Sequence, residues 1–275
     1  MEIFIQYTYF KCHAIVTKPV KNRYPFVNPK QRHMKPIHIF ISTLILFFAL
    51  PADAQWSKKI KGNGNVITEN REVSTYDEIN VNANIDVVLV AGKEGEITLK
   101  AEGNLLEFIE ISVTKDALKI KSKDRTELRP SKGKNILITV PVQNVYKLTL
   151  NGSGNIEGNA TLKEDKITLH VNGSGDMDVH VKAIEVKASL NGSGYITVSG
   201  KTDVFKATVN GSGDIDGNDL IATSCEGKII GSGDINFHAK QKLDAKIIGS
   251  GDIEVNESVL KIEKKIIGSG DVTKK

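Results

Sequence analysis

The sequence predicts an all-β protein, a parallel β-solenoid built from short Gly-Ser-Gly repeats. Three observations predict this fold: a repeated tripeptide, apolar residues that alternate on both sides of each copy, and a content of only 6% aromatic residues. A regular period of roughly 19 residues is typical of stacked repeat architectures, and strict alternation of apolar residues indicates strands. The seven copies of the tripeptide begin at Gly152, Gly173, Gly192, Gly211, Gly231, Gly249 and Gly268.

Residues 1–54 are expected to lie outside the folded domain. Residues 34–54 are interpreted as a signal peptide, because a basic start precedes the apolar run Ile39–Leu50 and an Ala-x-Ala cleavage site. The apolar run is short for a membrane span, so we expect cleavage before Gln55, with a retained anchor as the alternative. Residues 1–33 are interpreted as a mis-assigned start or a disordered leader, with Met34 as the true start.

The charge balance of the exported part argues against a nucleic-acid partner. The whole chain carries +4, of which residues 1–33 account for +5 and residues 34–54 for none, so residues 55–275 carry −1. No basic footprint for nucleic acid is therefore expected. Cys225 is the one cysteine after the predicted cleavage site, so no disulfide can form within the exported part. These features indicate an exported protein of the periplasm or the outer cell surface.

Each repeat is predicted to form a strand, a Gly-Ser-Gly corner, a second strand and a return turn. With the first glycine as position 0, apolar residues fall at −6, −4, −2, +4 and +6, on the same side as the glycines at 0 and +2. We expect glycine there because an inward side chain at the bend would clash with the opposite wall, and because glycine permits positive φ. Stacking such coils about 4.8 Å apart would bury the apolar side and pair the backbone. In the copy at Gly173 the apolar residues are Ile167, Leu169, Val171, Met177 and Val179.

Residues 55–275 are predicted to form a single domain, irregular over 55–145 and regular over 146–275. The polar loop Asp124–Lys134 within the irregular part is expected to be mobile, because it contains proline and glycine between two strand-like runs.

Two weaker copies of the repeat are predicted in the irregular part. One surrounds Gly62, and the other covers residues 79–89, where Ala83 and Ile85 take the two glycine positions. Both copies keep the alternation of the regular repeats, so both are expected to be coils of the same solenoid.

Outward-facing acidic residues at position +3 are predicted to form a column beside the corner. Carboxylates stacked about 4.8 Å apart repel unless they are bridged or screened, so the column is a candidate binding site for a cation or a glycan. The alternative, which we favour, is a solvated face that repeat duplication produces, neutralised by salt and by the neighbouring lysines, among them those at position −3 across the corner. The acidic residues are Asp176, Asp214, Asp234, Asp252 and Asp271, and the lysines are Lys228, Lys246 and Lys265.

Position −1 changes its chemistry along the repeats. The first four copies have asparagine there, whereas the last three have Ile230, Ile248 and Ile267. Because this position faces outward, the three residues predict an exposed apolar stripe that contacts a partner or a second copy of the chain. The alternative is a local twist that turns them under a neighbouring loop.

The repeats do not match the patterns of common cofactor or catalytic sites. Gly-Ser-Gly lacks the spacing of a phosphate-binding loop and does not open a helix, and its period differs from that of calcium-binding nonapeptide repeats. No histidine or cysteine cluster indicates a metal site, and no nucleophile is paired with a base. We therefore expect no catalytic residues, no metal and no cofactor.

Three features of the chain resemble a known family. The segments G-N-G-N-V at 62–66 and N-A-N-I-D-V-V-L at 82–89, followed by the ladder of N-G-S-G-x-I and I-I-G-S-G-D-I copies, are similar to the auto-transporter adhesin, head GIN domain family of Gram-negative bacteria. The resemblance covers about residues 56–273. It implies a right-handed parallel β-helix and an adhesive role, and it supplies no catalytic residues.

We therefore expect a non-enzymatic, adhesin-like interaction module of the cell envelope, with a glycan, a protein or another envelope component as its ligand and no membrane span after cleavage. One alternative is a carbohydrate-active enzyme, whose site would lie around residues 124–134, because residues 146–273 contain almost no inserted loops. The other alternative is an envelope scaffold that assembles from copies of itself.

Overall fold

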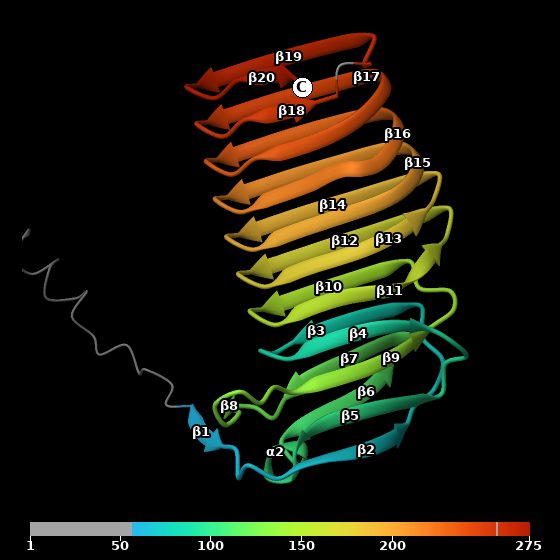
Figure 1. Ribbon diagram of the computed structural model, residues 1–275, viewed down its shortest axis with the longest axis vertical. Helices are drawn as coiled ribbons and strands as arrows, with labels where there is room; N and C mark the ends of the chain where they lie inside the picture. Colours follow the sequence, from blue (N-terminus) through green and yellow to red (C-terminus); the bar gives the residue numbers. More distant parts are fainter. Residues whose placement is uncertain (1–56, 257) are drawn as a thin grey trace, which may run out of the picture. The chain divides into compact units, whose positions relative to one another are not determined.

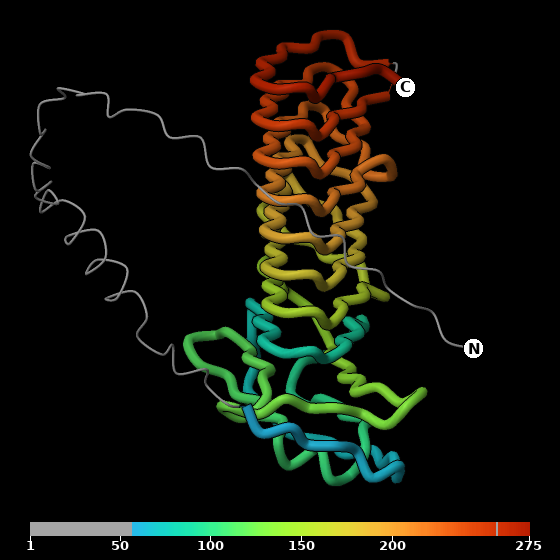
Figure 2. The backbone as a smooth tube through the Cα atoms, turned by 90° about the vertical axis from the view of Figure 1, so that its left-hand side faces the viewer, coloured from blue at the N-terminus to red at the C-terminus, as the bar shows by residue number. Residues whose placement is uncertain are grey.

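The structure is a computed structural model that describes residues 57–256 and 258–275. The predicted leader and signal peptide lie outside these residues. Residues Gln55–Lys275 form one compact unit, and the described part of it is almost entirely strand, in one sheet of 18 strands and one of two. Figure 1 shows the strands stacked as successive coils, and Figure 2 shows the same coils above the irregular part. The predicted fold, a parallel β-solenoid, is confirmed.

Seven Gly-Ser-Gly corners connect two parallel layers of strands in the regular part. We call the layer before the corners the pre-corner sheet and the layer after them the post-corner sheet. Each strand pairs in parallel with its equivalent in the next coil, so that Leu169 lies between Leu148 and Ala188. The long strands β15, β16 and β17 continue from one layer into the other. The strands are β10 (Lys147–Gly152), β11 (Asn155–Lys163), β12 (Lys166–Gly173), β13 (Asp176–Lys182), β14 (Glu185–Gly192), β15 (Tyr195–Gly211), β16 (Asp214–Gly231), β17 (Ile235–Gly249), β18 (Ile253–Val255), β19 (Lys261–Gly268) and β20 (Val272–Lys274).

The inward positions of the repeat form the core, as predicted. All five apolar residues of the coil at Gly173 are at most 1% exposed. Phe205 and Phe237 pack edge to face in the later coils, with ring centroids 5.4 Å apart. Two inward glycines make room for these rings, since a Cβ on Gly217 would lie 2.6 Å from Phe205 and one on Gly227 would lie 2.7 Å from Phe237. Each of the two rings therefore fills core space that a glycine leaves free, so the core stays closely packed.

The corner glycines are required by the preceding coil and not by the opposite wall, which corrects the predicted reason. The first glycine of every copy has a φ between +134° and +139°. A Cβ on Gly192 would lie 2.1 Å from the carbonyl oxygen of Gly173, and one on Gly194 would lie 2.1 Å from that of Gly175. The same Gly173 carbonyl accepts a hydrogen bond from the Ser193 amide at 2.9 Å. Each corner is therefore packed so closely on the corner of the preceding coil that no side chain fits between them.

The irregular part is stacked out of chain order. The coil formed by β3 and β4 lies directly beneath β10 and β11, as predicted for residues 79–89, although paired residues such as Asn82 and Asn151 are 69 positions apart. The coil beneath it comes from later in the chain, because β7 pairs with β3 and β9 pairs with β4. Antiparallel strands and a short helix cover the lower end in Figure 1. These elements are β2 (Val66–Glu72), β3 (Glu78–Asn82), β4 (Asp86–Ala91), β5 (Glu96–Glu102), α2 (Gly103–Leu106), β6 (Ile109–Thr114), β7 (Ala117–Ser122) and β9 (Leu137–Val142).

The prediction that the segment around Gly62 forms a coil is wrong. Strand β1 (Lys58–Lys61) pairs with β8 (Thr126–Arg129) in a separate two-stranded sheet. A Cβ on Gly62 would overlap the carboxylate of Glu102, which is only 1% exposed and accepts a hydrogen bond from the Gly64 amide. Gly62 therefore makes room for a buried carboxylate, Gly64 adopts a φ of +81° with no atom within 4 Å of an added Cβ, and the two do not form a solenoid corner.

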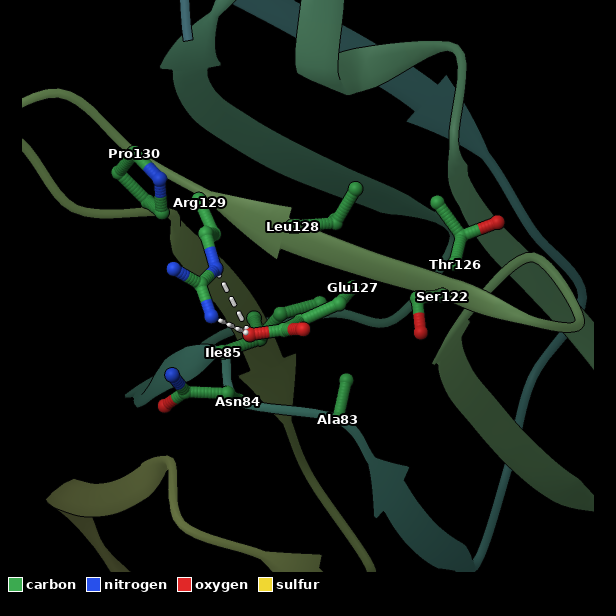
Figure 3. Close-up of a pocket in the computed structure, with 9 residues that line it drawn as sticks. All are labelled: Ala83, Asn84, Ile85, Ser122, Thr126, Glu127, Leu128, Arg129 and Pro130. Carbon is green, nitrogen blue, oxygen red and sulfur yellow. Dashed lines mark hydrogen bonds and ion pairs between the residues drawn. The ribbon is translucent and has the colours of Figure 1, made fainter. Parts of the chain in front are cut away.

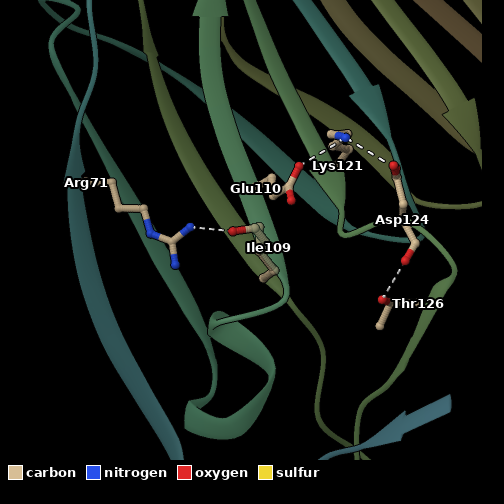
Figure 4. Close-up of polar contacts among 6 residues, drawn as sticks. All are labelled: Arg71, Ile109, Glu110, Lys121, Asp124 and Thr126. Carbon is tan, nitrogen blue, oxygen red and sulfur yellow. Dashed lines mark hydrogen bonds and ion pairs between the residues drawn. The ribbon is translucent and has the colours of Figure 1, made fainter. Parts of the chain in front are cut away.

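The loop Asp124–Lys134, predicted to be mobile, is anchored at several points. It contains β8, and Ser131 donates hydrogen bonds to Glu102 from its amide at 2.8 Å and its hydroxyl at 2.6 Å. At its start Lys121 contacts Asp124 at 3.4 Å, in the group of polar contacts that Figure 4 shows beneath the coils. The loop is therefore part of the folded structure.

The last described coil turns two lysines toward the core side. Lys264 and Lys274 occupy the inward positions at which the coil before has Ala245 and Val255. The Lys274 ammonium donates to the carbonyl of Val259 at 2.9 Å. Inward charges at a sheet edge oppose pairing with another edge, so this coil disfavours end-to-end assembly.

Candidate functional site

The outer edge of the pre-corner sheet carries a ladder of asparagines at position −1. The side-chain amide of each asparagine donates to the side-chain oxygen of the one in the coil before, at 2.8 Å for the three steps between Asn151 and Asn210. The hydrogen bonds run along the solenoid axis and are repeated in each coil. The ladder includes Asn82, Asn151, Asn172, Asn191 and Asn210.

The asparagine ladder ends at the isoleucine stripe, Ile230, Ile248 and Ile267. The strand register places Ile230 beside Asn210, Ile248 beside Ile230 and Ile267 beside Ile248. Ile230 is 40% and Ile267 is 55% exposed, while Ile248 is half-buried. The predicted stripe is therefore in register and exposed or half-exposed, and no loop of residues 57–256 or 258–275 covers it.

A lysine column, Lys228, Lys246 and Lys265, runs beside the isoleucine stripe. The three lysines are in register with one another and precede the isoleucines by two residues, so both sets face the same side of the sheet. None of the three forms an ion pair within 4.0 Å in the part of the chain that the structure describes. Within the described residues, no carboxylate therefore neutralises these charges by direct contact.

The acidic residues on the far side of the lysine column are mostly paired. They are Glu226, Asp244 and Glu263 at position −5. Lys242 contacts Asp244 at 3.1 Å and Glu263 at 3.4 Å, and Lys261 contacts Glu263 at 2.6 Å. Hydrogen bonds, first from Lys261, lower the pKa of Glu263 to about 2. Asp244 and Glu263 are thus engaged with lysines other than those of the lysine column, whereas Glu226 forms no ion pair within 4.0 Å among the described residues.

Three neighbouring positions change together between the fourth and fifth coils. Positions −5, −3 and −1 are Lys206, Thr208 and Asn210 in the fourth coil, and they become acidic, lysine and isoleucine in the last three. The corner glycines keep their φ and contacts across the same boundary, and the inward positions stay buried although their side chains change in size, so neither the corner nor burial accounts for this change of surface residues. We call the lysine column together with the isoleucine stripe the Lys-Ile face.

Carboxylates of the aspartate column accept hydrogen bonds from backbone amides of the following coil. The amide of Asp234 donates to the carboxylate of Asp214 at 2.8 Å, that of Asp252 to Asp234 at 2.8 Å, and that of Asp271 to Asp252 at 2.7 Å. The amide of Asp176 is bound in the same way by the side chain of Asn155, at 3.4 Å. Backbone donors thus offset the repulsion between stacked carboxylates. Among the residues described, no cluster of three or more acidic, histidine or cysteine side chains is placed to hold a metal ion.

A hollow of about 520 Å³ lies between the corner at Ala83–Ile85 and the residues of β8 (Figure 3). It exists because the coil below has no Gly-Ser-Gly corner, since the chain leaves β7 for β8 before it reaches β9. The absence of stacked corner carbonyls also explains why Ala83 and Ile85 can replace glycine. Glu127 and Arg129 line the hollow and form an ion pair at 2.8 Å.

The hollow is where the sequence would place an enzymatic site, but it does not assemble the expected chemistry. Glu127 is the one carboxylate among its lining residues, whereas glycoside hydrolysis uses two, about 5 to 10 Å apart. Glu127 is also engaged by Arg129. No histidine, cysteine or tyrosine is among the lining residues.

A second lysine column, Lys163, Lys182 and Lys201, lies at the return edge of the coils. A hollow of about 430 Å³ beside it is lined by His180 and Ser199, whose Nδ1 and Oγ atoms are 3.0 Å apart. No apolar column accompanies these lysines, and acidic residues of the return turns flank them.

The protein is thus a β-solenoid of stacked parallel coils, in which the outward-facing residues differ from coil to coil. The chain belongs to the family described as "Putative auto-transporter adhesin, head GIN domain", which matches residues 75–258. The resemblance seen in the sequence is therefore confirmed.

Solved structures of Bacteroides and Parabacteroides proteins have the same fold. A putative adhesin from Bacteroides fragilis is 20% identical with a TM-score of 0.72, over 78% of this chain and all of that one. A putative lipid binding protein from Parabacteroides distasonis is 26% identical with a TM-score of 0.67, over 79% of this chain and all of that one. A putative adhesin from Parabacteroides merdae is 21% identical with a TM-score of 0.64, over 80% of this chain and all of that one.

No curated protein matches the chain. The described residues include no helix with the length and apolar character that crossing a membrane requires. The solved chains consist of the solenoid unit alone, since about four fifths of this chain covers them completely. Together with the separate core of residues 55–275, this indicates that the unit folds on its own.

Proposed function

We propose that residues 55–275 act as a non-enzymatic, adhesin-like interaction module of the cell envelope, and that the Lys-Ile face contacts its partner. The observation that carries the proposal is the coordinated change of three surface columns in the last three coils. A contiguous exposed apolar stripe is typical of interaction surfaces. The family description and the adhesin and lipid-binding descriptions of the solved relatives support binding over catalysis.

We infer that the module is exported, to the periplasm or the outer surface of a Gram-negative envelope. The inference depends on the signal-peptide pattern of residues 34–54. Cell fractionation and N-terminal sequencing of the mature protein test it, and we expect Gln55 as the first residue. A full-length chain in the cytoplasmic fraction would contradict export.

A recoded variant tests the role of the Lys-Ile face without disturbing the fold. It replaces the three lysines by threonine and the three isoleucines by asparagine, which are the residues of the fourth coil at Thr208 and Asn210. The new asparagines extend the existing ladder, so the melting temperature should stay close to that of the native sequence.

The decisive experiment is a binding screen of residues 55–275 and the recoded variant against glycans, envelope proteins and lipids. We expect the native sequence to bind one of these classes and the recoded variant to lose that binding. Absence of any ligand, or equal binding by both proteins, would refute the proposal. The enzyme alternative is tested separately with a polysaccharide panel, where cleavage that is lost in Glu127→Gln would support it.

A further inference from the structure

We propose that the Lys-Ile face docks flat on an anionic lipid surface. This inference rests on the proposed function and names the partner of the same face. Three features of the face support an anionic, partly apolar and planar partner: the unpaired lysine charges, the apolar column beside them, and the flat register of both columns.

The charge of the face favours an anionic partner. Like charges in register on neighbouring strands are unfavourable, and the lysine column has no acidic partner within 4.0 Å in the described chain. The aspartate column, in contrast, is compensated by backbone amides. On the outward side of the pre-corner sheet, positions −7 to −1 of the last three coils carry five lysines and three carboxylates, a net charge of 5 − 3 = +2, and an anionic partner would offset the repulsion within the lysine column.

The apolar column beside the lysines favours a lipid surface. Residues two apart in a strand are separated by about 6.6 Å and successive coils by about 4.8 Å, so the six side chains form a small flat array. Lysine stems extend along apolar surface while the ammonium groups stay in the polar layer. The isoleucines can thus contact acyl chains while the lysines contact phosphate groups. A hollow of about 290 Å³ lies between the lysine column and the acidic residues at position −5, and the isoleucine stripe is not among its lining residues. A ligand confined to this hollow would leave the isoleucines uncovered, whereas a bilayer surface would cover both columns.

The position of the acidic residues sets the orientation and disfavours a second copy of the chain as partner. The aspartate column lies across the corner on the post-corner sheet, so flat contact through the pre-corner sheet keeps these carboxylates away from anionic headgroups. The acidic residues at position −5 do lie on the contact side, where Lys242 and Lys261 hold Asp244 and Glu263. A second copy would need a continuous free acidic column to meet the lysines, whereas among the described residues of the column at −5 only Glu226 forms no ion pair within 4.0 Å, and the carboxylates of Asp214, Asp234 and Asp252 accept backbone amides.

Vesicle flotation tests the proposal with residues 55–275. We expect binding to vesicles of phosphatidylcholine with phosphatidylglycerol and no binding to phosphatidylcholine alone. Each lysine near an anionic surface should contribute roughly a fivefold factor to the partition coefficient, so the recoded variant should bind at least about a hundredfold more weakly. Binding should also weaken as salt shortens the range of the charges.

Two further variants separate this face from general surface charge. Replacing Lys163, Lys182 and Lys201 by threonine removes the same number of charges from the other lysine column and should leave binding unchanged. The double variant Thr208→Lys/Asn210→Ile extends the Lys-Ile face by one coil and should strengthen binding by at least about fivefold.

Absence of binding to the anionic vesicles would overturn the proposal, as would equal loss from the two lysine columns. Sedimentation of the same proteins covers the remaining outcome: a dimer that dissociates on recoding, without vesicle binding, would assign the face to a second copy. A glycan or protein ligand that is lost on recoding, again without vesicle binding, would overturn the lipid partner while the proposed function stands.

Discussion

The need for glycine at the stacked corners gives a sharp prediction for Gly192→Ala. Two costs add at this position. The φ of +134° is a conformation that residues with a side chain adopt at a cost of about 1–3 kcal/mol. The new Cβ would lie 2.1 Å from the Gly173 carbonyl oxygen, and relieving such a contact costs about 1–3 kcal/mol more. The free energy of unfolding should therefore fall by about 2–6 kcal/mol.

Two matched variants separate these costs. Gly194→Ala adds a contact of 2.1 Å with the Gly175 carbonyl at a residue whose φ is not positive, so it should show the contact cost alone, about 1–3 kcal/mol. Gly133→Ala has a φ of +75° and no atom within 4 Å of the new Cβ, so it should lose about 1–2 kcal/mol from backbone conformation alone. Urea unfolding of residues 55–275 measures all three. Equal losses for Gly192→Ala and Gly133→Ala would refute the stacking explanation.

Three other predictions follow from particular contacts. Lys264→Ala/Lys274→Val gives the last coil the inward residues of the coil before it, and should produce concentration-dependent association in sedimentation; a monomer at all concentrations would show that these lysines do not protect the edge. Hydrogen bonds from Ser131 hold the pKa of Glu102 below its usual value, so the stability it adds is present above the unfolded pKa of about 4.3 and is lost as the pH falls through the lowered folded pKa. Unfolding of Glu102→Gln should therefore depend less on pH in that range, and an unchanged pH profile would contradict this role. Burial raises the pKa of the Cys225 thiol to about 12, so a thiol reagent near neutral pH should react only as the protein unfolds; rapid reaction of the native protein would contradict its burial.

The core and the regular coils could be predicted from the sequence because alternation reports directly which side of a strand is buried. The same parity identified residues 79–89 as a coil even though its corner is Ala83–Ile85. The order of the lower coils could not be predicted, since β7 and β9 follow β4 in the chain but lie beneath it. Pairing between strands that are far apart in the sequence leaves no recognisable residue pattern in either strand. The segment at Gly62 was wrongly predicted to be a coil for a related reason, because Gly62 makes room for Glu102, which is distant in the chain.

The candidate site was predicted only in part. The isoleucine stripe was visible as a change of residue type at an outward position, and the structure places it in register and exposed. The lysine column was interpreted as neutralising the aspartates, but none of its lysines reaches a carboxylate within 4.0 Å in the described residues. The carboxylates of Asp214, Asp234 and Asp252 accept backbone amides instead, and Asp271 pairs with a different lysine, Lys264, at 3.4 Å. A side chain's preference for a backbone partner depends on corner geometry, which the sequence pattern alone does not give.

The most direct test of the Lys-Ile face as the binding surface is the rate of lysine acetylation in residues 55–275 with and without Gram-negative outer-membrane vesicles. Mass spectrometry follows each lysine separately. We predict slower acetylation of Lys228, Lys246 and Lys265 on binding, and unchanged rates for the second lysine column. Equal protection of the two columns, or none at either, would contradict a role of this face in binding.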